Sequence, residues 1–198
     1  MSKATDQRRE KLRETLADIA ERHVRDGGLS SLRARALAEE AGCAVGAIYN
    51  VFDDMTGLAL AVNSRTFHRL GTFVSDAVAR RGGTDPTDRM VAMAMAYLQF
   101  ATDNPLLWRA LFDVEFAADR DVPEWYMEEL SRLFAIIAEP LSELKPEADA
   151  EDIHLMTRAL FSSVHGIVLL GLDGRVSIVP RDKIEDMIGF VLRGAAGN

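Results

Sequence analysis

The strongest constraint on the fold is a pair of short helical segments, each with one apolar face, between residues 33 and 52. Gly42 separates the two segments, and in the second one apolar residues recur at i, i+3, i+4 and i+7. Two short helices hinged at a glycine are the pattern of a helix-turn-helix. The apolar faces consist of Leu37, Ala38 and Ala41 in the first segment and of Val45, Ile48, Tyr49 and Phe52 in the second.

A third helix is needed to complete this unit, because helices of this length are marginal in water on their own. The preceding stretch supplies one, since apolar residues recur there at helical spacing. They are Leu12, Leu16, Ile19, Ala20 and His23. We therefore expect three helices to pack into a small N-terminal head, which we assign to residues 1–54.

Glycine and proline divide the rest of the chain into further helices, and the alternating patterns typical of strands are nearly absent. Pro86, Pro105 and Pro123 each follow a capping residue and favour a helix start, whereas Pro140 is expected to end a helix. The predicted fold class is all-α, with residues 55–198 as a second domain. The nine or so expected helices span residues 5–25, 32–41, 44–51, 53–80, 86–102, 105–116, 123–139, 148–170 and 180–194.

Charge is distributed unevenly along the chain. Residues 1–35 contain nine Lys or Arg against six Asp or Glu, a net +3, so residues 36–198 must carry −11 to give the total of −8. An acidic protein does not bind nucleic acid indiscriminately, because phosphate neutralisation supplies most non-specific affinity. This uneven distribution of charge is what we expect if only the N-terminal end contacts a polyanion. The alternative is that these alternating charges only solvate a helix surface.

Residues 41–52, followed by Asp53, Asp54, Met55 and Leu58, resemble the signature of the tetracycline-repressor (TetR) family. A second resemblance, to the WHG-type ligand-binding domain found in part of that family, lies at residues 96–108 and 161–166. Together they imply an all-helical protein whose third helix enters the major groove of DNA. They also imply a C-terminal domain that binds a small molecule.

The resemblance places DNA contacts near the starts of the second and third helices. Asn50 suits a bidentate contact with adenine and small apolar residues suit thymine methyls, whereas Tyr49 is either a phosphate contact or a core aromatic. Several polar contacts usual in the family are missing, since Ala44 replaces a Ser or Thr and Met55 replaces a Lys. The implied DNA-binding residues are Arg33, Arg35, Ala44, Val45, Gly46, Ala47, Tyr49 and Asn50, with Arg8 and Arg9 as further backbone contacts.

Aromatic and methionine residues recur at helical spacing in the second half of the chain. Adaptable methionines, aromatic walls and a few polar groups such as Tyr97 and His165 suit a hydrophobic or aromatic small molecule. The same stripe is also typical of an ordinary helical core, and both interpretations stay open here. The candidate ligand-binding residues are Met93, Tyr97, Phe100, Trp108, Phe112, Phe134, Phe161 and His165.

The last two helices carry more apolar residues than a small bundle needs. The resemblance implies that they form a two-fold homodimer, with two heads about one DNA turn apart, roughly 34 to 36 Å. Burial within a single chain is the alternative, and Gly166 is expected to let another helix approach closely. The stripes are Leu155, Leu160, Val164, Ile167 and Val168 in one helix, and Ile184, Met187, Ile188 and Val191 in the other.

No catalytic, cofactor or metal site is predicted. His165 lacks an accompanying nucleophile or paired carboxylates, and Cys43 with four scattered histidines makes no zinc pattern. No apolar run approaches the roughly 18 residues of a membrane span, and the polar N-terminus is unlike a signal peptide. We therefore expect a cytoplasmic protein that is not an enzyme and has no membrane partner.

These features predict a ligand-responsive transcriptional regulator acting as a homodimer. It would be a repressor, released from double-stranded operator DNA by an unidentified small-molecule effector. The competing hypothesis is a dimeric small-molecule-binding protein whose helix-turn-helix has lost useful DNA affinity. It is motivated by the apolar residues Ala44, Val45 and Met55 at positions where the family has polar contacts.

Overall fold

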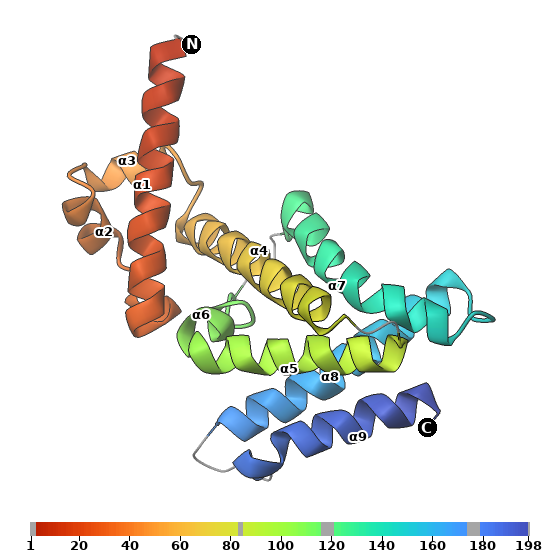
Figure 1. Ribbon diagram of the computed structural model, residues 1–198. Helices are drawn as coiled ribbons and strands as arrows, with labels where there is room; N and C mark the ends of the chain where they lie inside the picture. Colours follow the sequence, from red (N-terminus) through yellow and green to blue (C-terminus); the bar gives the residue numbers. More distant parts are fainter. Residues whose placement is uncertain (1–2, 83–84, 116–120, 174–178, 198) are drawn as a thin grey trace. The chain divides into compact units, whose positions relative to one another are not determined.

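The computed structural model describes residues 3–82, 85–115, 121–173 and 179–197, and over these residues the protein is all-helical (Figure 1). The predicted fold class is confirmed, since the described residues form nine α-helices and no strand. The helices are α1 (Lys3–Gly27), α2 (Ala34–Glu40), α3 (Val45–Tyr49), α4 (Met55–Arg81), α5 (Pro86–Asp103), α6 (Pro105–Ala110), α7 (Glu124–Leu144), α8 (Ala150–Leu172) and α9 (Ile184–Ala196), with short 3-10 helices η1 (Leu29–Ser31) and η2 (Arg181–Lys183).

The chain forms two compact units. Unit 1 comprises Met1–His68 and Asn104–Met127, and unit 2 comprises Arg69–Asp103 and Glu128–Asn198. Helix α4 therefore belongs to unit 1 in its first half and to unit 2 in its second half. The functional boundary predicted between residues 54 and 55 stays a prediction.

Unit 1 contains one continuous core beneath the helix-turn-helix. Leu16, Leu37 and Ile48, which have no exposed surface, bring α1, α2 and α3 together. Each such side chain contributes roughly 1.5 to 3 kcal/mol when it is fully buried. Helix α6, distant in sequence, packs on α1 and adds Leu107 and Ala110 to the same core (Figure 1). The head therefore depends on a segment that follows residue 100.

The turn between α2 and α3 is built by Gly42, as the sequence predicts. Its φ of +65° lies in the left-handed region, where a side chain is strained. The Gly42 amide donates to the carbonyl of Glu39 (3.1 Å) and the Cys43 amide donates to the carbonyl of Ala38 (2.9 Å). These two bonds satisfy carbonyls at the end of α2 and set the direction in which α3 leaves.

Helix α7 runs through Pro140 to Leu144, so the prediction that Pro140 ends the helix is wrong. Tertiary contacts compensate for the amide that proline lacks. Leu141 is almost fully buried, and Arg89 of α5 forms ion pairs with Glu139 and Glu143, one on each side of the proline. The Ser142 hydroxyl donates to carbonyls of the preceding turn.

The end of α6 also differs from prediction, whereas the starts of α4 and α8 have side-chain caps. Helix α6 ends at Ala110 rather than near Phe116, which lies outside the described residues. The carboxylate of Asp54 accepts a hydrogen bond from the amide of Gly57 (2.7 Å) and so caps the start of α4. Asp149 caps α8 in the same way through the amide of Asp152 (2.9 Å).

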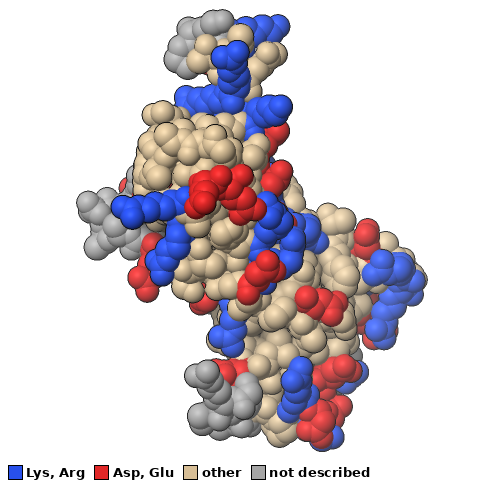
Figure 2. Space-filling model, turned by 90° about the vertical axis from the view of Figure 1, so that its left-hand side faces the viewer, with Lys and Arg blue, Asp and Glu red and all other residues tan. Residues whose placement is uncertain are grey.

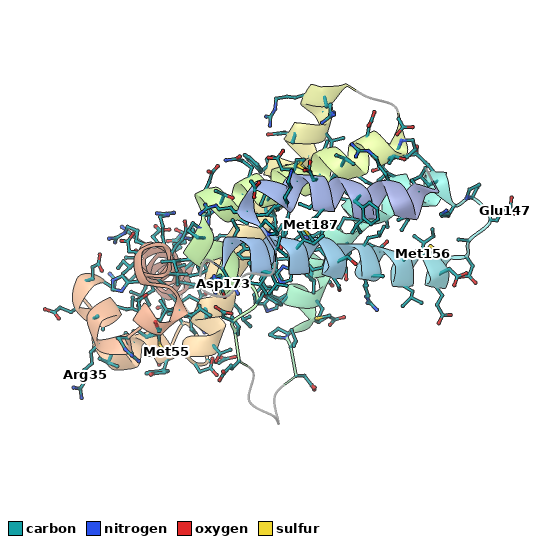
Figure 3. The ribbon with its side chains drawn as sticks, turned by 90° about the horizontal axis from the view of Figure 1, so that it is seen from below. Arg35, Met55, Glu147, Met156, Asp173 and Met187 are labelled. Atoms are coloured by element: carbon teal, nitrogen blue, oxygen red, sulfur yellow. The ribbon has the colours of Figure 1, made fainter. Side chains whose placement is uncertain are left out.

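Unit 2 is organised around the pair formed by α8 and α9, which lie side by side in Figures 1 and 3 and both contact α5. The close approach occurs at Gly171, where an added Cβ would lie 2.5 Å from Cδ1 of Ile184. At Gly166 an added Cβ would meet nothing within 4 Å, so the predicted close approach does not occur there within this chain.

Among the described residues, α8 alone is long and apolar enough to cross a membrane. The expectation that no segment approaches this length was too strict. Only 28% of its most apolar stretch is buried in the single chain. Length and composition do not by themselves distinguish a membrane span from a helix that packs on other protein surfaces, and α8 packs on α5 and α9.

Candidate functional sites

Helix α3 presents one face to the core and the other to solvent. Ile48 is fully buried, whereas Val45 is 37% and Tyr49 is 49% exposed. Asn50 is also exposed, at the C-terminal end of the helix. The side chain of Tyr49 is therefore accessible to a partner, and the core interpretation of this residue does not hold. Ala44, Gly46 and Ala47 complete the predicted set, with Ala47 half-buried and the other two exposed.

Helix α3 begins at Ala44 without a side-chain cap. Ala44 has extended backbone angles and no side-chain hydrogen bond to the first amides of the helix. A Ser or Thr there would satisfy one of these amides. The Ala47 amide instead donates to the backbone carbonyl of Ala44 (2.8 Å).

Two arginines of α2 lie near this surface within unit 1. Arg33 occupies the N-terminal boundary of α2 and Arg35 follows in its first turn, and both are exposed. Arg35 projects from the edge of the head in Figure 3. Neither forms an ion pair with any described residue. Their charge is therefore available to a phosphate backbone.

The basic residues of α1 fall into two groups. Those of its first turns are exposed and have no acidic partner among the described residues, and Figure 2 shows basic side chains gathered over this end of α1. Those further along are used within unit 1. The first group contains Lys3, Arg8, Arg9 and Lys11; the second contains Arg13, Arg22 and Arg25.

Arg13 has a structural role that the sequence did not reveal. Its Nη1 donates to the carbonyl of Val51 (2.7 Å), and its guanidinium lies 4.4 Å from the centre of the Phe52 ring. Both contacts hold the end of the helix-turn-helix against α1. The available signal was a positive charge directly after Leu12, the first residue of the apolar stripe of α1, but charge counting alone groups it with the DNA-facing residues.

A second polar contact joins α1 to α2. Glu40 accepts hydrogen bonds from His23 (2.9 Å) and Arg22 (2.7 Å), which hold the pKa of its carboxyl below the usual value. These exposed groups contribute little to stability. They join the end of α2 to α1.

Four of the predicted ligand-binding residues are in contact in unit 2. The Tyr97 hydroxyl lies 2.7 Å from Nδ1 of His165, and the Phe161 ring stacks on the imidazole with an interplanar angle of 14°. Phe134 of α7 meets Phe161 edge-on, with ring centres 5.2 Å apart. The cluster therefore joins α5, α7 and α8 through aromatic surfaces and one polar pair.

Burial lowers the pKa of His165 below its usual value. A neutral imidazole accepts at one nitrogen and donates at the other. If the Tyr97 hydroxyl donates to Nδ1, the proton of the ring is on Nε2. No group of three or more His, Cys, Asp or Glu side chains in the described part of the chain is placed to hold a metal ion.

The other four predicted residues lie elsewhere on α5 or in unit 1. Met93 and Phe100 are buried on α5, and Phe100 contacts Phe73 at 6.0 Å between ring centres. Trp108 and Phe112 belong to unit 1, where their rings contact each other at 5.7 Å. Trp108 is buried, whereas Phe112 is 43% exposed. Helical spacing placed residues on faces but did not divide them between units.

The apolar residues of α8 and α9 are divided between two faces. Most of the residues predicted for a dimer contact, including Val164, Val168 and Ile188, are buried within the single chain. Leu155 of the predicted set is 68% exposed. Three apolar residues outside that set are also exposed: Met156 (37%), Leu170 (41%) and Phe190 (80%).

The chain has an N-terminal helix-turn-helix whose second helix is exposed, and a helical body follows it. These features place it in the class of helix-turn-helix proteins. Comparison with known proteins makes the assignment specific. Residues 90–193 match the family model described as tetracyclin repressor-like, C-terminal domain. The chain is also 28% identical, over 98% of its length and 90% of the relative, to the HTH-type transcriptional repressor KstR of Mycolicibacterium smegmatis.

Solved structures share the fold. A protein of unknown function from Rhodococcus sp. RHA1 aligns with a TM-score of 0.74 at 24% identity, covering 93% of this chain and 95% of that one. RolR in complex with resorcinol aligns with a TM-score of 0.71 at 19% identity, covering 97% and 94%. The chain belongs to the tetracycline-repressor (TetR) family of transcriptional regulators.

Proposed function

We propose that this regulator is a homodimeric repressor that a hydrophobic or aromatic small molecule releases from operator DNA. The observation that carries the proposal is the exposed face of α3, where Tyr49 and Asn50 stand on a fully packed head beside the unpaired charge of Arg33 and Arg35. Similarity to a repressor along nearly the whole chain supports it. An intact head core and accessible recognition residues give no reason to favour the hypothesis of lost DNA affinity.

We expect two kinds of DNA contact: contacts with the phosphate backbone that position the head, and contacts with base edges that recognise the sequence. Arg33, Arg35 and the first turns of α1 would neutralise phosphates without reading sequence. Asn50 would read adenine, and Val45 with its small neighbours would contact thymine methyls. Because few polar groups remain on α3, DNA shape would supply part of the specificity.

The effector would bind among the aromatic residues of the helical body. The cluster of Tyr97, Phe134, Phe161 and His165 offers rings and one polar pair, a surface suited to a flat, largely apolar molecule. RolR, which shares the fold, binds resorcinol. We extend only the aromatic character of that ligand to this chain.

Release would follow from a shift between two populations of the dimer. Helix α4 starts directly after the helix-turn-helix and ends in unit 2, so a ligand that favours one position of α4 alters the spacing of the two heads. The dimer would form through α8 and α9, and the protein would act in the cytoplasm.

DNA binding is the first test. The protein is titrated against the duplex upstream of its own gene and a scrambled duplex, over a series of salt concentrations. We expect selective binding that weakens with salt, and Asn50→Ala should lose about 1 to 3 kcal/mol of discrimination. Arg35→Ala should weaken both duplexes and reduce the salt slope by about 0.9. Arg181→Ala, in η2, serves as the exposed control.

Equal binding to both duplexes would contradict the proposed operator recognition. Binding unaffected by salt and by either substitution in the head would contradict the DNA surface itself. If aromatic compounds fail to dissociate a specific complex with DNA, the protein would still be a DNA-binding regulator. Its release by this class of effector would then be refuted.

A further inference from the structure

Helix α3 carries no charged side chain on the surface that would face DNA. Between residues 44 and 52, only Tyr49 and Asn50 have polar side chains. The exposed side chains are otherwise apolar, since Ala44 is exposed and Val45 is 37% exposed. A partner that lies against α3 therefore meets aliphatic groups, one phenol ring and one amide.

The backbone that carries Asn50 is held in place within unit 1. The amide of Asn50 donates to the carbonyl of Ala47 (3.3 Å), and the amide of Val51 donates to that of Ile48 (3.0 Å). The carbonyl of Val51 accepts a hydrogen bond from Nη1 of Arg13 (2.7 Å). Because Ile48 and Val51 are buried, the outer face of α3 cannot turn inward without disrupting the core. A surface fixed in this way can be matched to particular bases.

The major groove of DNA offers different chemical groups at each base pair. Guanine exposes two acceptors, which Arg or Lys reads best, and cytosine exposes an amino donor, which a carboxylate reads. Adenine exposes a donor and an acceptor that match the side-chain amide of Asn50, and thymine exposes a methyl group that matches Val45 and Ala44. The side chains of α3 therefore suit A·T pairs and offer no charged partner to a G·C pair.

An apolar helix surface also disfavours G·C pairs. Against Val45, the polar edge of a G·C pair would lose its water without gaining a hydrogen bond. An A·T pair presents the thymine methyl group there, and burying that group is favourable. The preference between the two pairs thus includes a penalty on G·C as well as a gain for A·T.

We propose that the operator has A·T pairs at the positions that face α3, and that thymine methyl groups carry a measurable part of its affinity. The proposal rests on the proposed function and goes beyond it by excluding G·C pairs at these positions. The exposed charges of Arg33 and Arg35 support a polyanion as the partner of this surface. Both belong to the start of α2, so a guanine read by either lies outside the positions that face α3.

Selection from a random duplex library identifies the positions that α3 reads. The full-length protein is used, and the selection is repeated with Val45→Ala and Asn50→Ala, two changes at exposed residues. Positions at which either variant loses base preference are those read by α3, and we expect A·T pairs there. Met127→Ala changes another exposed apolar residue of unit 1 and should keep the wild-type preference.

Base analogues then separate base reading from DNA shape with the wild-type protein alone. Uracil in place of thymine removes only the methyl group, and we expect binding to weaken about fourfold per methyl contact. An inosine–cytosine pair has the major groove of G·C but keeps the minor groove of A·T. We expect it to weaken binding roughly five- to 150-fold per position. Uracil at thymines outside these positions should leave the affinity unchanged.

Three results would overturn the proposal while leaving operator recognition intact. They are G·C pairs at the positions read by α3, full affinity for the uracil duplex, and full affinity for the inosine–cytosine duplex. Base preferences that neither α3 variant alters would also overturn it, because α3 would then not read the sequence. If the library yields no enriched sequence, operator recognition itself fails, and the inference fails with it.

Discussion

At the scale of single residues, His165 makes the stability of unit 2 depend on pH. Burial lowers its pKa in the folded chain, whereas the unfolded chain titrates near 6.5. Between these two values the unfolded state binds more protons, so stability rises with pH. The stabilising effect of the neutral imidazole is complete above about pH 6.5 and is lost as the pH falls through this interval.

We therefore predict that His165→Gln reduces the pH dependence of unfolding below about pH 6.5. The free energy of unfolding is measured in urea at several pH values for wild type and variant. His154→Gln, an exposed histidine on the same helix, should behave as wild type. Parallel curves for wild type and His165→Gln would show that the pair with Tyr97 does not control this dependence.

At the scale of elements, the pairing of α8 with α9 depends on Gly171. A methyl group there would collide with the buried Ile184, so Gly171→Ala should destabilise the protein by about 1 to 3 kcal/mol. Gly194→Ala is the matched control, since an added Cβ meets nothing within 4 Å. The control should be neutral or gain up to about 1 kcal/mol in helix propensity. Equal urea midpoints for the two variants would refute the close approach.

At the scale of the whole molecule, the exposed apolar residues of α8 and α9 bear on assembly. Phe190 is 80% exposed in the single chain, and Leu155, Met156 and Leu170 of α8 are exposed as well. We predict that Phe190→Glu converts the proposed homodimer to a helical monomer and lowers operator affinity, because the heads no longer bind together. Sedimentation and circular dichroism measure the two properties. Met127→Glu, an exposed residue outside α8 and α9, should remain dimeric.

The sequence by itself determined the fold class and the position of the helix-turn-helix. The apolar spacing of Leu37, Ile48 and Phe52 is a local property, and all three residues are buried as the spacing predicts. The turn at Gly42 was also predictable from the sequence, because glycine adopts a positive φ without strain. Local signals of this kind need no knowledge of distant contacts.

Only the tertiary structure decided which helices complete each unit. The continuation of α7 through Pro140 depends on Arg89, far away in sequence, and the core of the head depends on Leu107. The hydrogen bond from Asn63 of α4 to the Ala110 carbonyl was not recognisable either, since one polar residue on a helix gives no sign of a buried bond to a distant residue. Periodicity assigns a residue to a helix face, but what covers that face depends on contacts between distant parts of the chain.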